Sequence, residues 1–445
     1  MLLKQKINHS IKSKYKFLDD YICNAKTGIV KDVFQWLPEP DDPKVFLIAA
    51  ITSNSYRFNN QHANTFNSGV GLTLKDACGA AIGESIERYS SSFINKKDLI
   101  LSRYKDLRVK AVNPKEFAFY HKNQYAIKNF PFKEFTEDTL INWVECYSLT
   151  NKCNKLLPAA TVFLPYKNDE ASCENLIWYP VSTGLSCANN IEEATLKGIY
   201  EVIERDCFSI LWFNKLEMPI INFNDNNELN EMYKKHFEIP NCKYHLVDMT
   251  MDVKIPSVLG ILEDYSGGIM IAAATRLNLK DAVKKTFIEL SQGRISWKKD
   301  FVEGIECTFK EDFSDIRDFH SRVQLFTKKN MKKHITFAYN SIETSDINNK
   351  YPKHNEDIKS QLNIAIKILK EKGYEVLVYD LTTPDIRQRG FNVVRVVIPG
   401  FTEITNDHVI PRAGGDRIYE VPYKLKIKSK KSDFNNLNPI PHPFP

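Results

Sequence analysis

The 445-residue sequence lacks most of the patterns by which enzymes are usually recognised. It has no GxxxxGK[ST] phosphate-binding loop, no HExxH zinc motif and no GxSxG nucleophile motif. Its ten histidines form no HxxH or HxxxH pair, and its nine cysteines form no CxxC pair. These absences exclude the common zinc sites and leave the cysteines as reduced thiols. Any nucleotide site must therefore be of an unusual kind.

Long apolar runs and strong net charge are also missing. The run VFLIAAI at 45–51 is too short to cross a bilayer, and the N-terminal residues lack the continuous apolar stretch of a signal peptide. The formal charge of +6 is small for this length, and KLKIKSKK at 424–431 is the only charge run. We favour a solvated linker over a partner-binding patch for that run. We expect a cytoplasmic protein with no membrane and no nucleic-acid partner.

Helical and β-rich segments alternate along the chain. Helical periodicity is found at 74–93, 191–211, 280–298 and 355–372. The β-rich segments are 45–51, 142–149, 157–165, 258–263, 267–276, 375–381 and 393–399. This order predicts an α+β fold with mixed α/β layers. We expect residues 1–64 to pack on a main domain that spans 65–445.

The helix expected at 74–93 has an unusual polar side. Its apolar stripe comprises Cys78, Ile82, Ile86, Tyr89 and Phe93, listed by helical spacing. Glu84, Glu87 and Arg88 lie on the opposite side, together with alanines at 77, 80 and 81. A solvated surface would normally carry more charged residues. This side therefore resembles a surface that another group approaches closely.

The helix expected at 191–211 repeats the pattern. GESIER at 83–88 and YEVIER at 200–205 share the motif ExxER, with Glu84 and Glu201 lying 117 residues apart. Glu193, Glu201 and Glu204 cluster on one side of the second helix, away from its apolar stripe. Two short matches could arise by chance. The alternative is that the two helices form two halves of one site.

Facing helices of this kind would bring five carboxylates together. Such a cluster cannot stay ionised in a partly buried site without cations between its members. Oxygen-only ligands suit Mg²⁺, which is commonly shared with substrate phosphates. Arginines are bidentate partners of phosphate. The residue chemistry thus indicates a metal–phosphate site.

The motifs resemble those of the YcaO family. The matching segments are GLTLKDACGAAIGESIERYS at 71–90, STGLSCANNIEEATLKGIYEVIERD at 182–206, IELSQGR at 288–294, VVRVVIPGFTEI, RAGGDRIYEVP and the tail NPIPHPFP. The resemblance implies a YcaO-type fold that binds ATP without a P-loop. Two positions depart from the family pattern, since Ala81 replaces a serine and Val70 replaces a lysine.

Site residues follow from the resemblance by position. It implies that Mg²⁺ and the triphosphate are bound by Glu84, Glu87, Glu193, Glu201 and Glu204. It implies that Arg88, Arg205 and Arg294 contact phosphate. It also implies that Arg88 and Arg205 are catalytic. Asn189 and Gln292 would line the same ATP pocket.

The RAGGDRIYEVP segment and the PHPFP ending look like those of azoline-forming cyclodehydratases. In such enzymes a Cys, Ser or Thr of a ribosomally made peptide attacks the preceding amide, and ATP phosphorylates the resulting oxygen before the thiazoline or oxazoline forms. Rival interpretations are a YcaO enzyme that makes thioamides or amidines, and a non-catalytic ATP-binding scaffold that docks a peptide. Phosphate release in the presence of precursor and partner would separate the scaffold from the enzymes.

The tail NPIPHPFP has proline at 439, 441, 443 and 445, which favours an extended polyproline II path. It could be a surface tail or a ligand for a proline-binding groove. The resemblance instead gives the Pro445 carboxylate a catalytic role in orienting or deprotonating the substrate. It also implies a precursor peptide, a ThiF-like leader-binding partner and, less directly, a flavin dehydrogenase. A homodimer is possible within the family.

Overall fold

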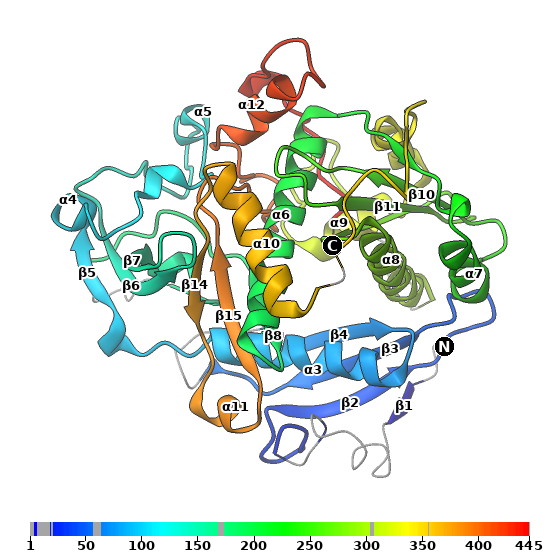
Figure 1. The fold of residues 1–445 in the computed structure, drawn as a ribbon, viewed down its shortest axis with the longest axis horizontal. Helices are drawn as coiled ribbons and strands as arrows, with labels where there is room; N and C mark the ends of the chain where they lie inside the picture. Colours follow the sequence, from blue (N-terminus) through cyan, green and yellow to red (C-terminus); the bar gives the residue numbers. More distant parts are fainter. Residues whose placement is uncertain are drawn as a thin grey trace.

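The computed structural model describes residues 4–6, 18, 21–56, 64–167, 173–302, 307–354 and 356–444. Within these residues the strands form three sheets (Figure 1). The first sheet contains, in spatial order, β1 Lys4–Lys6, β2 Val30–Trp36, β3 Phe46–Thr52 and β4 Phe66–Gly71. All its strand pairs are antiparallel. Strand β3 pairs with β4, so strands from before and after residue 64 share one sheet. The division at residue 64 remains a prediction.

Helix α3, Leu74–Ser91, lies along this sheet (Figure 1). Its N-terminus is capped by Thr73, whose side chain accepts a hydrogen bond from the Asp76 backbone N–H. The helix approaches β4 very closely at Gly69, where an added Cβ would lie 2.2 Å from the Ala81 nitrogen. The alanine side of α3 is therefore approached by a strand of its own chain. This explains the glycines of GVG at 69–71 without a nucleotide loop.

The second sheet carries the middle of the chain. Its strands, in spatial order, are β12 Ile269–Thr275, β11 Ser257–Glu263, β10 Lys243–Asp248, β9 Ile220–Ile221 and β13 Thr344–Ser345. The pairs are antiparallel except β13 with β9. Helix α8, Leu279–Val302, packs on β11 and β12, and α7, Asn227–His236, lies at the same end of the molecule (Figure 1).

The third sheet joins segments from three parts of the sequence. Its strands are β5 Ile100–Arg103, β6 Leu140–Ser148, β14 Leu377–Asp380, β15 Asn392–Val397 and β8 Leu185–Ala188, with β7 Cys153–Pro158 also paired to β6. The short helices α4 Tyr104–Leu107, α5 Lys122–Tyr125 and α11 Pro384–Gln388 connect its strands. The strand predicted at 157–165 is wrong beyond Pro158, because Ala159–Thr161 forms a 3-10 turn.

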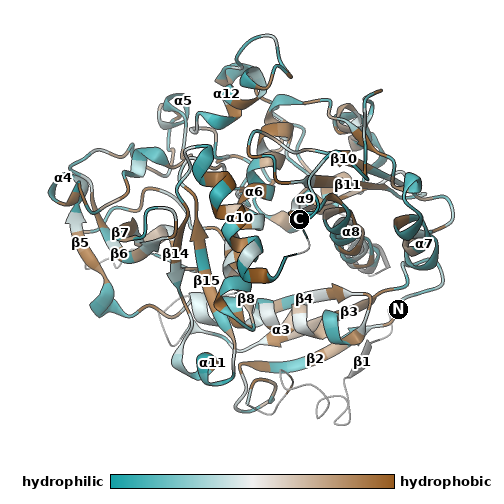
Figure 2. Cartoon of the chain, in the orientation of Figure 1, coloured by the Kyte–Doolittle hydropathy of each residue, from teal (hydrophilic) through white to brown (hydrophobic). Residues whose placement is uncertain are grey.

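Helix α6, Ile191–Asn214, lies between the second and third sheets. Its stripe residues Leu196, Ile199 and Ile203 are buried, as its spacing predicts. The helices α10 Ile358–Glu371 and α12 Arg417–Lys424 pack on it, and α9 Phe319–Phe326 lies near its C-terminal half (Figure 1). Figure 2 shows apolar residues concentrated in the strands that face this core, such as β11 and β15. The α+β class and mixed layers are confirmed. Among the described helices, none is long and apolar enough to cross a membrane.

Candidate ATP and magnesium site

Helix α3 directs Glu84, Glu87 and Arg88 away from its buried stripe. The backbone N–H of Cys187 in β8 donates to Glu87 Oε1 at 2.7 Å. The backbone N–H of Ser68 in β4 donates to Glu84 Oε2 at 3.2 Å. Arg88 lies 3.4 Å from the other oxygen of Glu84. Two strands therefore hold the carboxylates of the first ExxER motif through backbone donors.

Helix α6 presents the second motif in the same way. Arg205 lies 3.6 Å from both Glu201 and Glu204. The backbone of Gly184, just before β8, forms a hydrogen bond to Glu201 that lowers its pKa. Strand β8 contacts both α3 and α6. The predicted meeting of the two ExxER helices is therefore seen in the structure, and β8 lies between them.

The electrostatics show that the carboxylates are crowded. Burial raises the pKa of Glu87 to about 8; Arg88 opposes the shift, while Glu201 and Glu84 add to it. Burial likewise raises the pKa of Glu204 to about 7, with Arg205 opposing and Glu201 adding. The pKa of Glu201 is also raised, mainly by burial. Carboxylates from both helices thus destabilise one another's charged forms.

This donor set fits Mg²⁺ and phosphate. The carboxylate oxygens offer the hard ligands that Mg²⁺ prefers, and a divalent cation would remove the repulsion that raises their pKa values. Arg88 Nε is buried and has no hydrogen-bond partner, so it is an unused donor for an anion beside the cluster. Glu84, Glu87, Glu201 and Glu204 would hold the metal, and Arg88 and Arg205 would face the phosphates.

Glu193 and Asn189 lie at the N-terminal end of α6. Glu193 is paired with Lys197 at 2.7 Å and lines a hollow of about 140 Å³ together with Tyr200 and Arg276. Asn189 is exposed in the turn before the helix. Eight residues separate Glu193 from Glu201, about 12 Å along a helix, so this end lies apart from the main cluster. Burial raises the pKa of the Cys187 thiol, and the charges of Glu87 and Glu193 both add to this rise.

The segment IELSQGR at 288–294 has the pattern ExxQxR, and helix α8 divides its predicted site residues between two faces. Gln292 Nε2 donates to Ser68 Oγ at 2.8 Å, which connects it to the strand that holds Glu84. Residues two apart on a helix point in different directions, so Arg294 faces away from Gln292. Arg294 is fully buried and pairs with Asp42 at 2.6 Å. The geometry does not support the predicted phosphate contact of Arg294.

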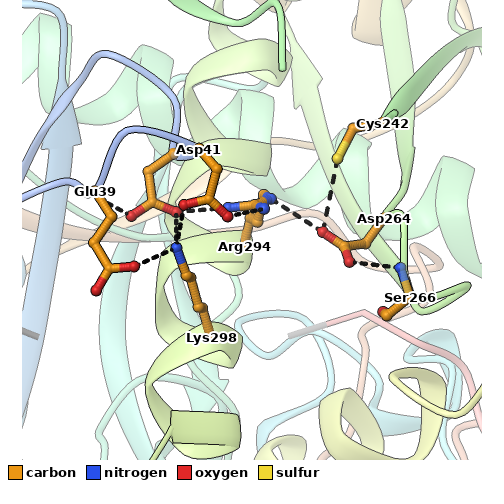
Figure 3. A network of polar contacts seen from close by, with 8 residues as sticks. Glu39, Asp41, Cys242, Asp264, Ser266, Arg294 and Lys298 are labelled. Carbon is orange, nitrogen blue, oxygen red and sulfur yellow. Dashed lines mark hydrogen bonds and ion pairs between the residues drawn. The ribbon is translucent and has the colours of Figure 1, made fainter. Parts of the chain in front are cut away.

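Figure 3 shows the network around Arg294. Arg294 also pairs with Asp264 at 3.2 Å, and Lys298 pairs with Asp41 at 2.5 Å and with Glu39 at 2.7 Å. The oxygens of Glu39, Asp41 and Asp42 lie within 4.8 Å of one another, a spacing that would suit a metal ion. Lys298 already supplies the cation at that point. The network therefore joins the β2–β3 connection to α8 and is structural.

Glu289 was missed as a site residue, although it begins the ExxQxR motif. It lies three residues before Gln292 and so on the same face of α8. Burial raises the pKa of Glu289, but Lys285, Arg276 and Arg205 lower it by more, and Glu289 in turn raises the pKa of Glu204. It therefore borders the carboxylate cluster. The helical spacing within the motif was the signal that could have separated Glu289 from Arg294.

The proline-rich tail lies against α6. The Asn438 backbone N–H donates to the Phe213 carbonyl at 2.8 Å, and Trp212 Nε1 donates to the Ile440 carbonyl at 3.0 Å. Farther along, the buried Phe444 ring lies 4.2 Å from the Arg205 guanidinium. The tail thus runs from the C-terminal end of α6 back to the second ExxER motif. Pro445, the predicted catalytic residue, lies outside the described residues.

A family model described as YcaO cyclodehydratase, ATP- and Mg²⁺-binding, matches residues 68–402. The chain belongs to the YcaO family. ATP and Mg²⁺ are accordingly its cofactors. An uncharacterized protein of Methanothermobacter thermautotrophicus is 24% identical over 360 residues, which cover 79% of this chain and 84% of that protein.

Solved structures of the YcaO family share the fold. A heterocyclase in complex with substrate and cofactor matches with a TM-score of 0.78 and 24% identity, covering 94% of this chain and 55% of that one. YcaO from Methanopyrus kandleri bound with AMPPCP and Mg²⁺ has a TM-score of 0.60 and 18% identity, covering 87% and 88%. The E. coli microcin synthetase McbBCD complex has a TM-score of 0.58 and 14% identity, covering 85% and 90%. The chain spans about half the length of the heterocyclases it matches.

Proposed function

We propose that this YcaO protein forms heterocycles in a ribosomally made precursor peptide, at the expense of ATP. Its target would be Cys, Ser or Thr residues, and its products thiazolines or oxazolines. The observation that carries the proposal is the meeting of three elements at one place. Glutamates of both ExxER helices converge there, and the tail brings Phe444 onto Arg205 beside them.

The chemistry suits a site that has carboxylates and arginines but no catalytic triad. The substrate side chain supplies the nucleophile, so the protein has to position reactants and neutralise charge. ATP supplies the phosphoryl group that converts the amide-derived oxygen into a leaving group. Glu84, Glu87, Glu201 and Glu204 would hold its Mg²⁺, with Glu193 beside the adjoining hollow. Arg88 and Arg205 would neutralise the phosphates, and Gln292 and Asn189 would line the pocket.

The C-terminal carboxylate of Pro445 would act as the orienting group or base. Phe444, its neighbour, is buried against Phe208 with ring centroids 4.8 Å apart and lies over Arg205. Pro445 is bonded to Phe444, which contacts Arg205 of the second ExxER motif, so we propose that the Pro445 carboxylate works beside that motif. General-base catalysis requires such placement within hydrogen-bond reach of the proton that is removed.

Partners belong to the same proposal. The heterocyclase in complex with substrate is nearly twice as long as the part of it that this chain matches, and the McbBCD structure is a complex of several proteins. We propose that a ThiF-like protein binds the leader of the precursor and delivers it to this chain. A flavin dehydrogenase would oxidise the products to azoles.

The test is reconstitution with a precursor peptide and a ThiF-like protein. Mass spectrometry should show the loss of one water per ring only when ATP and both proteins are present. Backbone thioamide formation would instead appear as an exchange of oxygen for sulfur, and it would overturn the proposal.

The same assay tests the tail. Deletion of His442–Pro445, or a short C-terminal tag, should suppress ring formation far more than it weakens ATP binding. An equal tag at the N-terminus is the matched control and should be nearly harmless. Normal cyclisation by the truncated protein would show that the tail has no catalytic role.

A further inference from the structure

One buried cation near the tail has no carboxylate partner among the residues that the structure describes. Arg322 on α9 is 1% exposed, and no carboxylate of the described residues lies within ion-pair distance of it. Its Nε is buried without a hydrogen bond. Arg395 is also buried without a carboxylate contact, but its nitrogens donate to three backbone carbonyls. Burial of an uncompensated charge is costly, so Arg322 calls for a specific explanation.

Within the described part of the chain, the hydrogen-bond contacts of the Arg322 guanidinium are with the tail and one backbone carbonyl, and its carbon also lies 5.6 Å from the centre of the Phe319 ring. Its Nη1 donates to the Thr405 carbonyl and contacts Nε2 of His442. A guanidinium can only donate hydrogen bonds. The imidazole must therefore offer a lone pair, which a doubly protonated ring does not have. The Phe444 backbone N–H lies 3.3 Å from Nδ1 of the same ring, but a neutral ring has a single lone pair, so the ring accepts from either Arg322 or Phe444 and not from both at once.

This contact sets the position of the end of the tail. The His442 ring packs edge-on against Phe208 with centroids 5.6 Å apart. Two residues later, Phe444 packs on the same Phe208 and lies over Arg205. A tail that slipped by one residue would place a proline against Arg322. His442 is thus a polar contact that distinguishes the observed register from its neighbours.

We propose that Arg322 is a positioning residue for the tail: by binding the neutral imidazole of His442, it fixes the register in which Phe444 meets Arg205, and it makes docking of the tail sensitive to acid. The expected effect on ring formation rests on the function proposed above. The effect on docking does not.

The acid sensitivity follows from the groups around the ring. Burial lowers the pKa of His442 well below its ordinary 6.5, and Arg322 on α9, His408 and Arg205 on α6 lower it further, while the Thr405 carbonyl opposes them. Asp407 and Asp318 are the acidic groups that face Arg322, and both lie beyond ion-pair distance. The pKa of His408 is lowered to about 4, chiefly by burial, so His408 stays neutral near pH 6.

These pKa shifts determine the direction in which docking of the tail changes with pH. An undocked tail has an ordinary histidine, which takes up a proton below pH 6.5, whereas the docked ring resists protonation. Docking is therefore strongest above pH 6.5 and weakens as the pH falls below it. One proton limits the change to about tenfold per pH unit.

The experiment measures hydrogen exchange of the tail by mass spectrometry. Prolines lack an amide proton, so exchange in residues 438–444 reports on Asn438, Ile440, His442 and Phe444 alone. Rates are normalised to the unstructured-peptide rate at each pH and compared about one unit above and one unit below 6.5. Wild-type protection should fall by up to about tenfold across this interval.

Two variants and a control make the test specific. Arg322→Met keeps the side-chain bulk and removes the donors, and should lose protection even at the higher pH. His442→Gln keeps an acceptor without a titrating group, and should stay protected at both values. Arg387→Met removes an exposed arginine that is paired with Asp380, and should behave as wild type. Should Arg322→Met fail to fold, the pH response of His442→Gln still decides the matter.

Unchanged protection in folded Arg322→Met, or the same pH response in wild type and His442→Gln, would overturn the proposal. ATP affinity should be preserved in both variants, whereas ring formation by Arg322→Met should fall in kcat. Docking of the tail could follow these expectations while the rate of ring formation stays the same in all variants. In that case the proposed catalytic role of the tail is wrong and the positioning role of Arg322 stands.

Discussion

The carboxylate cluster between α3 and α6 and the network around Arg294 contain the same formal charges. The cluster has Glu84, Glu87, Glu201 and Glu204 with two arginines, and the network has Glu39, Asp41, Asp42 and Asp264 with Arg294 and Lys298. Their distances differ. Each cation of the network has at least one carboxylate contact of 2.5–2.7 Å beside longer ones of 3.2–3.5 Å, whereas the contacts of the cluster are all 3.4–3.6 Å.

The pKa shifts follow the distances. Burial raises the pKa of Asp41, but its contacts with Lys298 and Arg294 more than offset this, so the pKa is lowered overall. In the cluster the arginines do not offset burial, and the pKa values of Glu87 and Glu204 are raised. Asp41 is also more exposed than the glutamates, which lowers the cost of its charge. The comparison teaches that a count of charges does not identify a ligand site; incomplete pairing does.

The largest expected effect separates the two regions directly. Glu87→Gln and Glu204→Gln should each lower ATP turnover about 100-fold or more, because each removes a carboxylate that we propose binds the metal. Both proteins should remain folded with an unchanged or raised Tm, since a crowded charge is removed. Phosphate release and thermal unfolding measure the two quantities. MgATP should raise the Tm of wild type and not that of the variants.

A folded Glu87→Gln protein with normal turnover would contradict this assignment of the site. The assignment would equally fail if the variants bound MgATP as tightly as wild type.

The opposite pattern is expected in the network. Asp42→Asn leaves the buried Arg294 without its shortest ion pair, and loss of one partner of a buried pair costs about 3–5 kcal/mol. The free energy of unfolding in urea should fall by that amount. Turnover per folded molecule should change much less than in Glu87→Gln. Full stability of Asp42→Asn would mean that the network is not a structural connection between the β2–β3 segment and α8.

The smallest effect concerns the packing that places α3. Gly69→Ala would bring a Cβ against the backbone of Ala81 and should destabilise the protein by about 1–3 kcal/mol. It should also lower ATP affinity, because the adjacent Ser68 holds both Glu84 and Gln292. Gly79→Ala on α3 is the control: nothing lies within 4 Å of its added Cβ, and a gain of about 0.5–1 kcal/mol is expected. Equal stability and equal ATP affinity of the two variants would show that the close packing at Gly69 does not position the site.

Much of this arrangement could be predicted from local patterns. Helical spacing predicted the buried stripe of α6 and the polar side of α3, and the shared ExxER motif predicted that the two helices would meet. The strand predicted at 157–165 failed because a β-rich composition does not distinguish a strand from the buried turn after Pro158. Phe93 was assigned to the stripe of α3, yet the helix ends at Ser91 and the ring is 46% exposed.

The ion pairs of Arg294 could not be predicted from its motif alone. Its partners Asp42 and Asp264 are distant in sequence and belong to no pattern that includes it. The contact of Arg322 with the tail could not be predicted either, because the tail lies more than a hundred residues later in the sequence. Contacts between distant segments carry no local periodicity, so only the fold reveals which charges are already paired.

Strand β8, only four residues long, holds the two halves of the cluster together through its main chain. Cys187 and the preceding Gly184 bind Glu87 and Glu201 with backbone groups, which every amino acid except proline provides. Side chains along this strand can therefore change over evolution while the glutamates keep their places. Gly184 is an exception, since its φ of +83° and its closeness to the Val396 carbonyl disfavour any side chain. Such tolerance is one way in which proteins with a quarter or fewer of their residues in common can preserve the same fold.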